Sequence, residues 1–247
     1  MKSITIAFRA TKMMIPIGYH HQVQSLIYNL LRKGGREELH DKGLCFGSRG
    51  YKLFTFSSLR GGKVIREQKK LYFENRAFLD IRSVDPDFCD SLLSGLQSKE
   101  QINLCGFHLS VESVKINDIP IVKSTVNIKM LSPLSVHKTD ENSHTEYMSP
   151  LDAAFADEIN ANFVRKYYAF YGKNPISKIV IKTKSVGMRD KYITLYKKAE
   201  KPNQKDIYIT GWRGEYELSG LPEYLNFLYY CGLGARNSDG FGMFEII

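Results

Sequence analysis

Residues 3–32, SITIAFRATKMMIPIGYHHQVQSLIYNLLR, change from the pattern of a strand to the pattern of a helix. Apolar and polar side chains alternate over residues 3–9, as they do in a half-buried strand. A helical period follows over residues 19–32, and Gly34-Gly35 ends this helix. Its apolar stripe, at the i, i+3, i+4, i+7 and i+8 spacing, consists of Val23, Leu26, Ile27, Leu30 and Leu31. The chain is therefore predicted to open with a strand and an amphipathic helix.

The same change of pattern occurs a second time before residue 117. An aromatic-rich strand is predicted at 51–59, and a further strand at 71–84 follows a polar hairpin tip at 63–70. Asp85-Pro86 opens a second helix, and residues 107–116 have the pattern of a closing strand. The predicted order is β-α-β-β-α-β, which is the ferredoxin-like or split-βαβ unit.

A polar turn that ends in Pro120 is the predicted boundary between two domains, residues 1–118 and residues 121–247. The second half is predicted to contain, in order, a strand at 122–131, a polar hairpin tip or loop at 137–144, a helix at 151–171, strands at 177–184, 191–197 and 207–213, a helix at 222–230 and a final strand at 240–247. This order also fits β-α-β-β-α-β. The sequence therefore predicts an α+β protein with two tandem ferredoxin-like domains, the scaffold that RRM proteins use to bind RNA.

The charge of the chain favours a polyanionic partner. Its 247 residues carry 35 Lys and Arg against 26 Asp and Glu, which gives a formal net charge of +9. An excess of this size favours nucleic acid or an anionic membrane surface. The membrane is disfavoured, because no run approaches the roughly 18 to 20 apolar residues of a bilayer span, and the N-terminus lacks a signal-peptide pattern. The protein is expected in the cytoplasm.

The four cysteines give no sign of a metal site. Cys45, Cys89, Cys105 and Cys231 are scattered, no CxxC pair is present, and the six histidines do not have zinc-ligand spacing. Burial in a core is the simpler interpretation of each cysteine. The chemistry of this chain is therefore expected to proceed without a metal or another cofactor.

A glycine-rich segment, GLGARNSDGFG at 232–242, precedes the final strand. Glycines let a backbone approach a phosphate closely, and successive N–H groups can then bind the anion. We expect an RNA-binding loop in which Arg236 and Asn237 supply further donors. The candidate loop residues are Gly232, Gly234, Arg236, Asn237, Gly240 and Gly242. The alternative is an ordinary turn that needs positive φ. The spacing does not fit a dinucleotide fingerprint or a P-loop.

The segment just before this loop is strongly basic. Residues 182–213 contain nine Lys and Arg, interleaved with Tyr192, Tyr196, Tyr208 and Trp212. Basic and aromatic residues on one hairpin suit RNA phosphates and stacked bases. The basic candidates for RNA binding here are Arg189, Lys191, Lys197 and Lys198. The alternative is a solvated hairpin whose aromatic side chains turn into the core.

Three residues in the first half are candidates for catalysis, although spacing alone does not join them into a site. Tyr28 lies about 130° from the centre of the apolar stripe, at 100° per residue, which suits either a site or a domain interface. His40, in ELHDKG, has an ordinary pKa of about 6.5 and can exchange a proton near neutral pH. Lys52 opens the strand YKLFTFS and would otherwise be a solvated lysine.

Two groups of segments resemble the family of CRISPR repeat-processing endoribonucleases. IPIGYHHQVQSLIYNLL, LHDKG and YKLFTFS are similar to the amino-terminal part of that family, and GLGARNSDGFGMF is similar to its glycine-rich signature. The resemblance implies tandem ferredoxin-like domains that bind CRISPR repeat RNA and cut it once per repeat. Tyr28, His40 and Lys52 match the tyrosine, histidine and lysine that form the site in one branch of the family.

The reaction that this resemblance implies is attack by a ribose 2′-OH on its own 3′-phosphate, leaving a 2′,3′-cyclic phosphate and a 5′-OH. His40 and Tyr28 would share the acid and base roles, and Lys52 would neutralise the phosphorane. A subunit that holds repeat RNA in an interference complex without cutting it is an alternative, as is an unrelated basic scaffold. Subunits of such a complex and a second copy of this chain are the expected protein partners.

Overall fold

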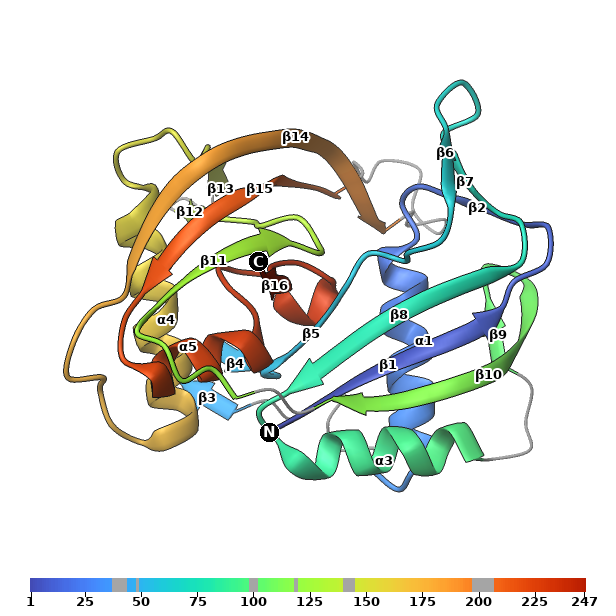
Figure 1. Cartoon of the computed structure of the whole chain (residues 1–247), viewed down its shortest axis with the longest axis horizontal. Helices are drawn as coiled ribbons and strands as arrows, with labels where there is room; N and C mark the ends of the chain where they lie inside the picture. The colour runs from blue at the N-terminus through green and yellow to red at the C-terminus, as the bar shows by residue number, and fades with distance from the viewer. Residues whose placement is uncertain (37–43, 48, 98–101, 118–119, 140–144, 197–206) are drawn as a thin grey trace.

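The N-terminal half forms an antiparallel sheet with two helices packed on it (Figure 1). The computed structural model describes residues 1–36, 44–47, 49–97, 102–117, 120–139, 145–196 and 207–247, with the backbone alone at 45, 49, 188–196, 207 and 208. This half contains β1 (Lys2–Arg9), α1 (His20–Lys33), β5 (Phe54–Phe56), β8 (Arg76–Ser83), α3 (Pro86–Gln97), β9 (Ile102–Leu104) and β10 (Phe107–Asn117). The strand order is β5-β8-β1-β10-β9.

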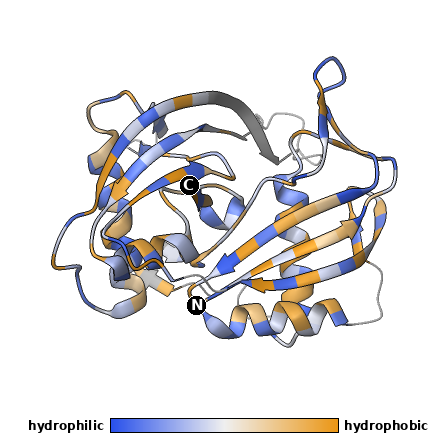
Figure 2. Ribbon diagram, viewed as in Figure 1, coloured by the Kyte–Doolittle hydropathy of each residue, from blue (hydrophilic) through white to orange (hydrophobic). Residues whose placement is uncertain are grey.

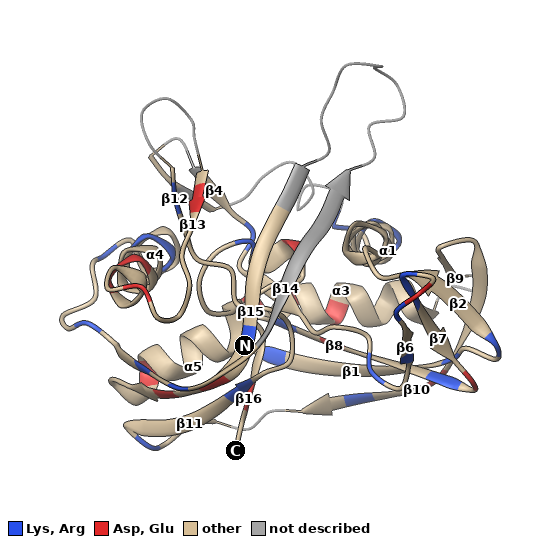
Figure 3. Ribbon diagram, turned by 90° about the horizontal axis from the view of Figure 1, so that it is seen from above, with Lys and Arg blue, Asp and Glu red and all other residues tan. Residues whose placement is uncertain are grey.

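The C-terminal half repeats this topology. It contains β11 (Thr125–Met130), α4 (Phe155–Tyr171), β14 (Val180–Tyr196), β15 (Ile207–Ser219), α5 (Pro222–Cys231) and β16 (Phe244–Ile246), with the 3₁₀ turn η1 (Asn237–Asp239) before the last strand. Its order, β14-β15-β11-β16, matches β5-β8-β1-β10 element for element. Seen from above, α1 and α4 lie on the same side of β1, β10 and β11 (Figure 3). The predicted tandem of ferredoxin-like units is confirmed.

Short strands are added to these two units. β2 (Met13–Pro16), β6 (Lys63–Ile65) and β7 (Lys70–Phe73) form a three-stranded sheet, β3 (Leu44–Phe46) pairs with β4 (Arg49–Tyr51), and β12 (His137–Thr139) pairs with β13 (Thr145–Tyr147). The β6–β7 pair is the hairpin predicted around residues 63–70. The β12–β13 pair places a hairpin where the polar stretch 137–144 was expected, although residues 140–144 lie outside the described part of the chain.

Four strand predictions were wrong in detail. The strand predicted at 51–59 is divided, because Leu53 has φ 45° and interrupts the extended backbone between β4 and β5. The strand predicted at 71–84 is divided at 74–75 into β7 and β8. The strands predicted at 177–184 and 191–197 are one strand, β14, whose pairing with β15 shifts register four times. Bulges of this kind disturb the alternation of apolar and polar residues, so the sequence pattern predicts two strands where the structure has one.

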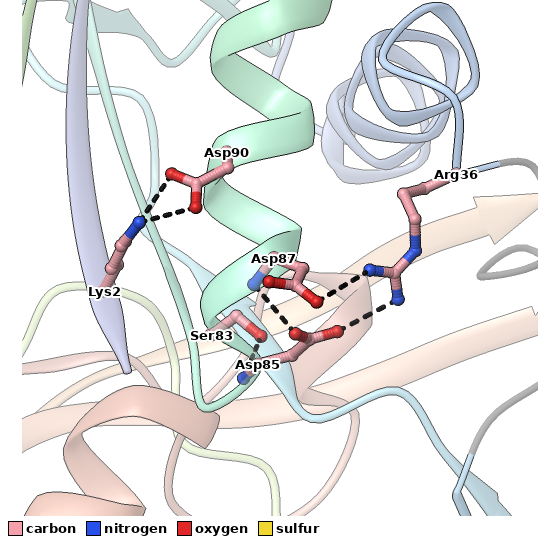
Figure 4. Close-up of polar contacts among 6 residues, drawn as sticks. All are labelled: Lys2, Arg36, Ser83, Asp85, Asp87 and Asp90. Carbon is pink, nitrogen blue, oxygen red and sulfur yellow. Dashed lines mark hydrogen bonds and ion pairs between the residues drawn. The ribbon is translucent and has the colours of Figure 1, made fainter.

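Polar contacts near the start of α3 connect this helix to β1 and to the segment that follows α1 (Figure 4). Asp85 accepts a hydrogen bond from the Asp87 backbone N–H at 2.9 Å, which satisfies one of the free donors of the first helical turn. Arg36, just after α1, pairs with Asp85 at 3.2 Å and with Asp87 at 3.8 Å. Lys2 of β1 contacts Asp90 of α3 at 2.6 Å. These contacts hold α1, β1 and α3 in one arrangement.

Each half has its own apolar core, but the two halves are not independent. Figure 2 shows apolar residues alternating with polar ones along β1, β8 and β10. Leu53 and Val84, from the N-terminal half, pack in the core of the C-terminal half. Arg82 of β8 donates a hydrogen bond to the Phe244 carbonyl at 2.6 Å and lies 3.6 Å from the centre of the Tyr229 ring. The boundary at 118–121 stays a prediction, and residues 118 and 119 lie outside the described part.

No helix among the described residues is long and apolar enough to cross a membrane.

Candidate functional site

Tyr28 and Lys52 lie next to each other, although α1 carries the first and the segment between β4 and β5 carries the second. The Lys52 Nζ is 4.9 Å from the centre of the Tyr28 ring, within the range of a cation–π contact. The Tyr28 ring meets Phe54 edge-on at 5.9 Å, which holds it on the outer side of the N-terminal core. Both side chains are half-buried. The structure therefore brings together two of the three catalytic candidates.

The third candidate, His40, lies outside the described residues, as do Lys197 and Lys198. Arg189 and Lys191 lie in β14, where only the backbone is described. These four basic residues and His40 stay predictions.

Lys52 also lines a pocket of about 410 Å³ between the two halves. One wall belongs to the N-terminal half and contains Lys52; the other consists of α4, the start of β12 and the loop before β16. The pocket is lined by Gly50, Tyr51, Lys52, Leu53, Val136, His137, Glu158, Asn162, Arg165, Lys166, Gly234, Ala235, Arg236, Asn237, Ser238 and Asp239. The β3–β4 hairpin supports this arrangement, because Phe46 meets Tyr168 of α4 edge-on at 5.2 Å. Sequence reasoning did not find the α4 wall.

The glycine-rich loop is organised around a buried ammonium group. Lys166 of α4 is 2% exposed, and its Nζ donates hydrogen bonds to the Gly232 carbonyl at 2.6 Å, the Gly234 carbonyl at 3.1 Å and the Asn237 Oδ1 at 3.0 Å. Burial lowers the pKa of Lys166. The Asn237 amide donates in turn to the carbonyls of Leu233 and Phe241. Asn237 is thus engaged inside the loop, where the sequence had suggested a donor for RNA.

The glycines of this loop allow close backbone packing. Gly232, Gly234, Gly240 and Gly242 all have positive φ. A Cβ on Gly242 would lie 1.9 Å from the Leu233 carbonyl oxygen, and one on Gly240 would lie 2.3 Å from the Phe56 ring. Several loop N–H groups already bond to backbone carbonyls elsewhere in the protein: that of Gly242 donates to the Pro133 carbonyl, and that of Ala235 donates to the Ser135 carbonyl. This geometry favours the alternative of a turn that needs positive φ over a cradle of N–H groups.

Arg236 is the loop side chain that faces the pocket with a cationic group open to solvent. Its side chain is 42% exposed and lies 3.6 Å from Asp239. Burial raises the pKa of Asp239, and Arg236 together with a hydrogen bond from Gln24 opposes that rise. Gln24 is on the same off-core face of α1 as Tyr28, and it also donates to the Ser238 carbonyl at 2.9 Å. The off-core face of α1 therefore packs against the glycine-rich loop.

The basic hairpin divides its side chains between core and solvent. Trp212 is 5% exposed, so this aromatic residue turns into the protein, as the alternative interpretation predicted. Lys182 and Lys184 are exposed and lie 3.1 and 3.9 Å from Glu217. Figure 3 shows Lys and Arg on α1 and α4, on either side of the β14–β15 ribbon. Basic residues thus occur on both helices that lie beside this ribbon.

No group of three His, Cys, Asp or Glu suited to a metal ion occurs among the described residues. Cys89 and Cys231 are buried, and burial raises the pKa of the Cys89 thiol to about 12.

The whole chain matches known proteins. Family models described as "CRISPR-associated protein Cas6, N-terminal" and "CRISPR associated protein Cas6, C-terminal" match residues 14–115 and 115–246. A "CRISPR-associated endoribonuclease Cas6 1" from Methanocaldococcus jannaschii is 27% identical over 240 residues, covering 93% of this chain and 86% of the relative. A "CRISPR-associated endoribonuclease Cas6" from Pyrococcus furiosus is 23% identical over 237 residues, covering 94% of this chain and 83% of the relative.

Solved structures agree on the fold. One described as "CRISPR associated protein Cas6" superposes with a TM-score of 0.78 at 24% identity, covering 100% of this chain and 99% of that one. Another, "An RAMP protein binding different RNA substrates", gives a TM-score of 0.80 at 20% identity and full coverage of both chains. Two successive family models that together span residues 14–246 establish that the chain belongs to the CRISPR-associated Cas6 family.

Proposed function

We propose that this protein is an endoribonuclease that binds CRISPR repeat RNA and cuts precursor CRISPR RNA once within each repeat. The observation that carries the proposal is the contact between Tyr28 and Lys52, the second of which also lines the pocket between the halves. Membership of the Cas6 family supports it, and the curated relatives are named endoribonucleases.

The chemistry would be an attack by the 2′-OH on the adjacent phosphorus, with loss of the 5′-oxygen. The developing phosphorane gains negative charge, which the Lys52 ammonium would stabilise. Tyr28 and His40 would divide the remaining work: one accepts the 2′-OH proton, and the other donates a proton to the leaving oxygen. The products are a 2′,3′-cyclic phosphate and a 5′-OH end, and this scheme assigns no step to a metal.

The predicted RNA-binding residues take different roles in this proposal. Arg236 would contact a phosphate directly, whereas the four glycines and Asn237 would hold the loop in shape around Lys166. The exposed lysines at the base of β14 lie on the strand that also carries Arg189 and Lys191. We propose that this strand, with Lys197 and Lys198, binds phosphates further along the RNA. The protein would act in the cytoplasm, either alone, as a pair of copies, or with the subunits of an interference complex.

The test is cleavage of the repeat RNA of the host's own array, in EDTA, under single-turnover conditions. His40→Ala should slow cleavage by at least about 100-fold, the lower range for a lost proton-transfer group. His108→Ala is the matched control, because His108 lies exposed on β10, and it should cut at the wild-type rate. A substrate with a single 2′-deoxyribose at the cut site should bind but remain uncut.

Three other outcomes would change the proposal. Tight binding without cleavage by the wild type would favour the RNA-holding subunit. Equal rates for wild type and His40→Ala would remove His40 from the site and keep the enzyme. No preference for the repeat over unrelated RNA would favour a general basic scaffold.

A further inference from the structure

The helix α4 presents two different faces. Its apolar face packs in the C-terminal core and consists of Phe155, Ile159, Phe163 and Tyr167. A second face, at the i, i+4 and i+7 spacing, carries Glu158, Asn162 and Arg165, and all three line the pocket that Lys52 lines from the other half. Three polar side chains on one stripe of a helix point the same way. The pocket therefore has a polar wall on α4, and Lys52 lines the same pocket from the other half.

Two groups on this wall are buried without a hydrogen-bond partner within the part of the chain that the structure describes. They are the Oδ1 of Asn162 and the Nε of Arg165. A buried acceptor or donor without a partner loses its hydrogen bonds to water and gains none in the protein, so native proteins rarely keep one without a reason. An acceptor and a donor one turn apart, both in a pocket of about 410 Å³, indicate a ligand that supplies the complementary groups.

The charged residues that line the pocket indicate the chemistry of that ligand. Lys52, Arg165 and Arg236 are cationic, and they suit a phosphate. Glu158 stands on the same wall, and its carboxylate would repel a simple anion but would accept hydrogen bonds from an amino group. An amide, a guanidinium and a carboxylate side by side are the groups that read the edge of a nucleobase. A nucleotide has both the phosphate and the base edge that this combination requires.

We propose that the face formed by Glu158, Asn162 and Arg165 is a nucleotide subsite that holds one unpaired base of the repeat beside the cleavage position. This inference rests on the proposed endoribonuclease function and names a determinant of its specificity. Lys52 lines the pocket and also contacts Tyr28, so the bound nucleotide would neighbour the scissile phosphate. Binding an extruded base is the usual way in which proteins read single-stranded RNA.

The test combines Asn162→Ala with a set of repeat RNAs, each of which has one abasic nucleotide near the cut site. On intact RNA, Asn162→Ala should raise the Kd, or the KM of cleavage, about tenfold, within the range for one lost base contact. Wild type should bind one of these abasic RNAs about as weakly as Asn162→Ala binds intact RNA. On that RNA, Asn162→Ala should have no further effect.

Asn174→Ala is the matched control, because Asn174 is exposed beyond the end of α4 and does not line the pocket. It should behave as wild type with every RNA. The free protein gives a second readout: since the Asn162 Oδ1 has no partner among the described residues, Asn162→Ala should leave the unfolding temperature unchanged or raise it. A large loss of stability would instead assign Asn162 a structural role and overturn the proposal.

The same experiment separates the two proposals. If wild type does not cut the intact repeat, the endoribonuclease function fails whatever the Asn162 variant does. If wild type cuts and Asn162→Ala cuts and binds equally well, the nucleotide subsite fails and the enzyme stands. If the effect of Asn162→Ala is the same on every abasic RNA, no single base occupies the pocket, and the subsite fails in that way too.

Discussion

His20, the first residue of α1, shows how strongly the surroundings of a single side chain can change its chemistry. Its ring lies 5.0 Å from the ring of Tyr19, 5.5 Å from that of Phe241 and 6.4 Å from that of Phe56. It is 3% exposed, and neither ring nitrogen has a hydrogen-bond partner among the described residues. Burial, helped by the charge of Arg213, lowers the pKa of His20 to about 3. The sequence motif Tyr-His-His gives no indication of this environment.

This lowered pKa predicts acid sensitivity. The unfolded chain takes up a proton on His20 near pH 6.5, whereas the folded protein takes it up only near pH 3, so acidification favours unfolding between these values. His20→Phe keeps an aromatic ring there and removes the titration. Below about pH 6, wild type should lose about 1.4 kcal/mol of unfolding free energy per pH unit more than the variant does. Urea unfolding of both proteins between about pH 4 and about pH 7 measures the difference. Parallel curves would show that His20 is charged or hydrogen-bonded in the folded state.

At the scale of elements, the loop between α5 and β16 is held by close packing of its backbone. Gly242 has φ 76°, and the Leu233 carbonyl oxygen occupies the space that a Cβ would need. Gly172, which ends α4, has a similar φ of 69° but nothing within 4 Å of its missing Cβ. A comparison of the two glycines therefore separates the cost of a positive φ from the cost of a clash with the added Cβ.

Replacing each of these glycines by alanine should destabilise the protein by different amounts. Gly172→Ala should lower the unfolding free energy by about 1–2 kcal/mol, because a residue with a side chain is strained in the left-handed conformation. Gly242→Ala adds a clash with backbone, so it should cost about 1–3 kcal/mol more. Thermal unfolding followed by circular dichroism compares the two. Equal losses would mean that the loop rearranges around the new methyl group at little cost.

At the scale of the whole molecule, an excess of nine positive charges over the 247 residues favours binding to RNA before any specific contact forms. Part of this charge is engaged inside the protein: Lys166 holds the glycine-rich loop, and Arg82 joins the two halves. The rest includes Lys182, Lys184, Arg165 and Arg236, which lie on the β14 strand and around the pocket. If RNA binds there, as we propose, these residues would neutralise phosphates and release their counterions.

This charge predicts that affinity for repeat RNA depends on salt. Between about 50 and about 200 mM NaCl, the Kd should rise at least about tenfold, as expected when several phosphates are neutralised. Fluorescence anisotropy with labelled repeat RNA measures the Kd, and the unfolding temperature at each salt concentration shows whether the protein stays folded. A Kd that hardly changes with salt would mean that base contacts and stacking, not phosphates, provide most of the binding energy.

The sequence by itself determined the order of the elements, because the period of a helix and of a strand is a local property. The helices α1 and α5 agree with the predicted helices at 19–32 and 222–230 to within one residue at each end, α3 begins at Pro86 as predicted, and α4 begins four residues later than predicted, at Phe155. Local pattern also placed Tyr28 on the outer side of α1, where it meets Lys52. Local pattern did not predict the bulges of β14 or the positive φ of Leu53, since these depend on how the strands pair.

Only the tertiary structure decided the role of Asn237 and the existence of the α4 wall. The loop pattern around Asn237 looks the same whether its amide meets a phosphate or a buried lysine, and Lys166 is 71 positions away in the chain. Lys52, Asn162 and Arg236 likewise come from segments that no local period relates to one another. A pocket depends on which faces two folded units present to each other, and that is decided by the packing of their cores.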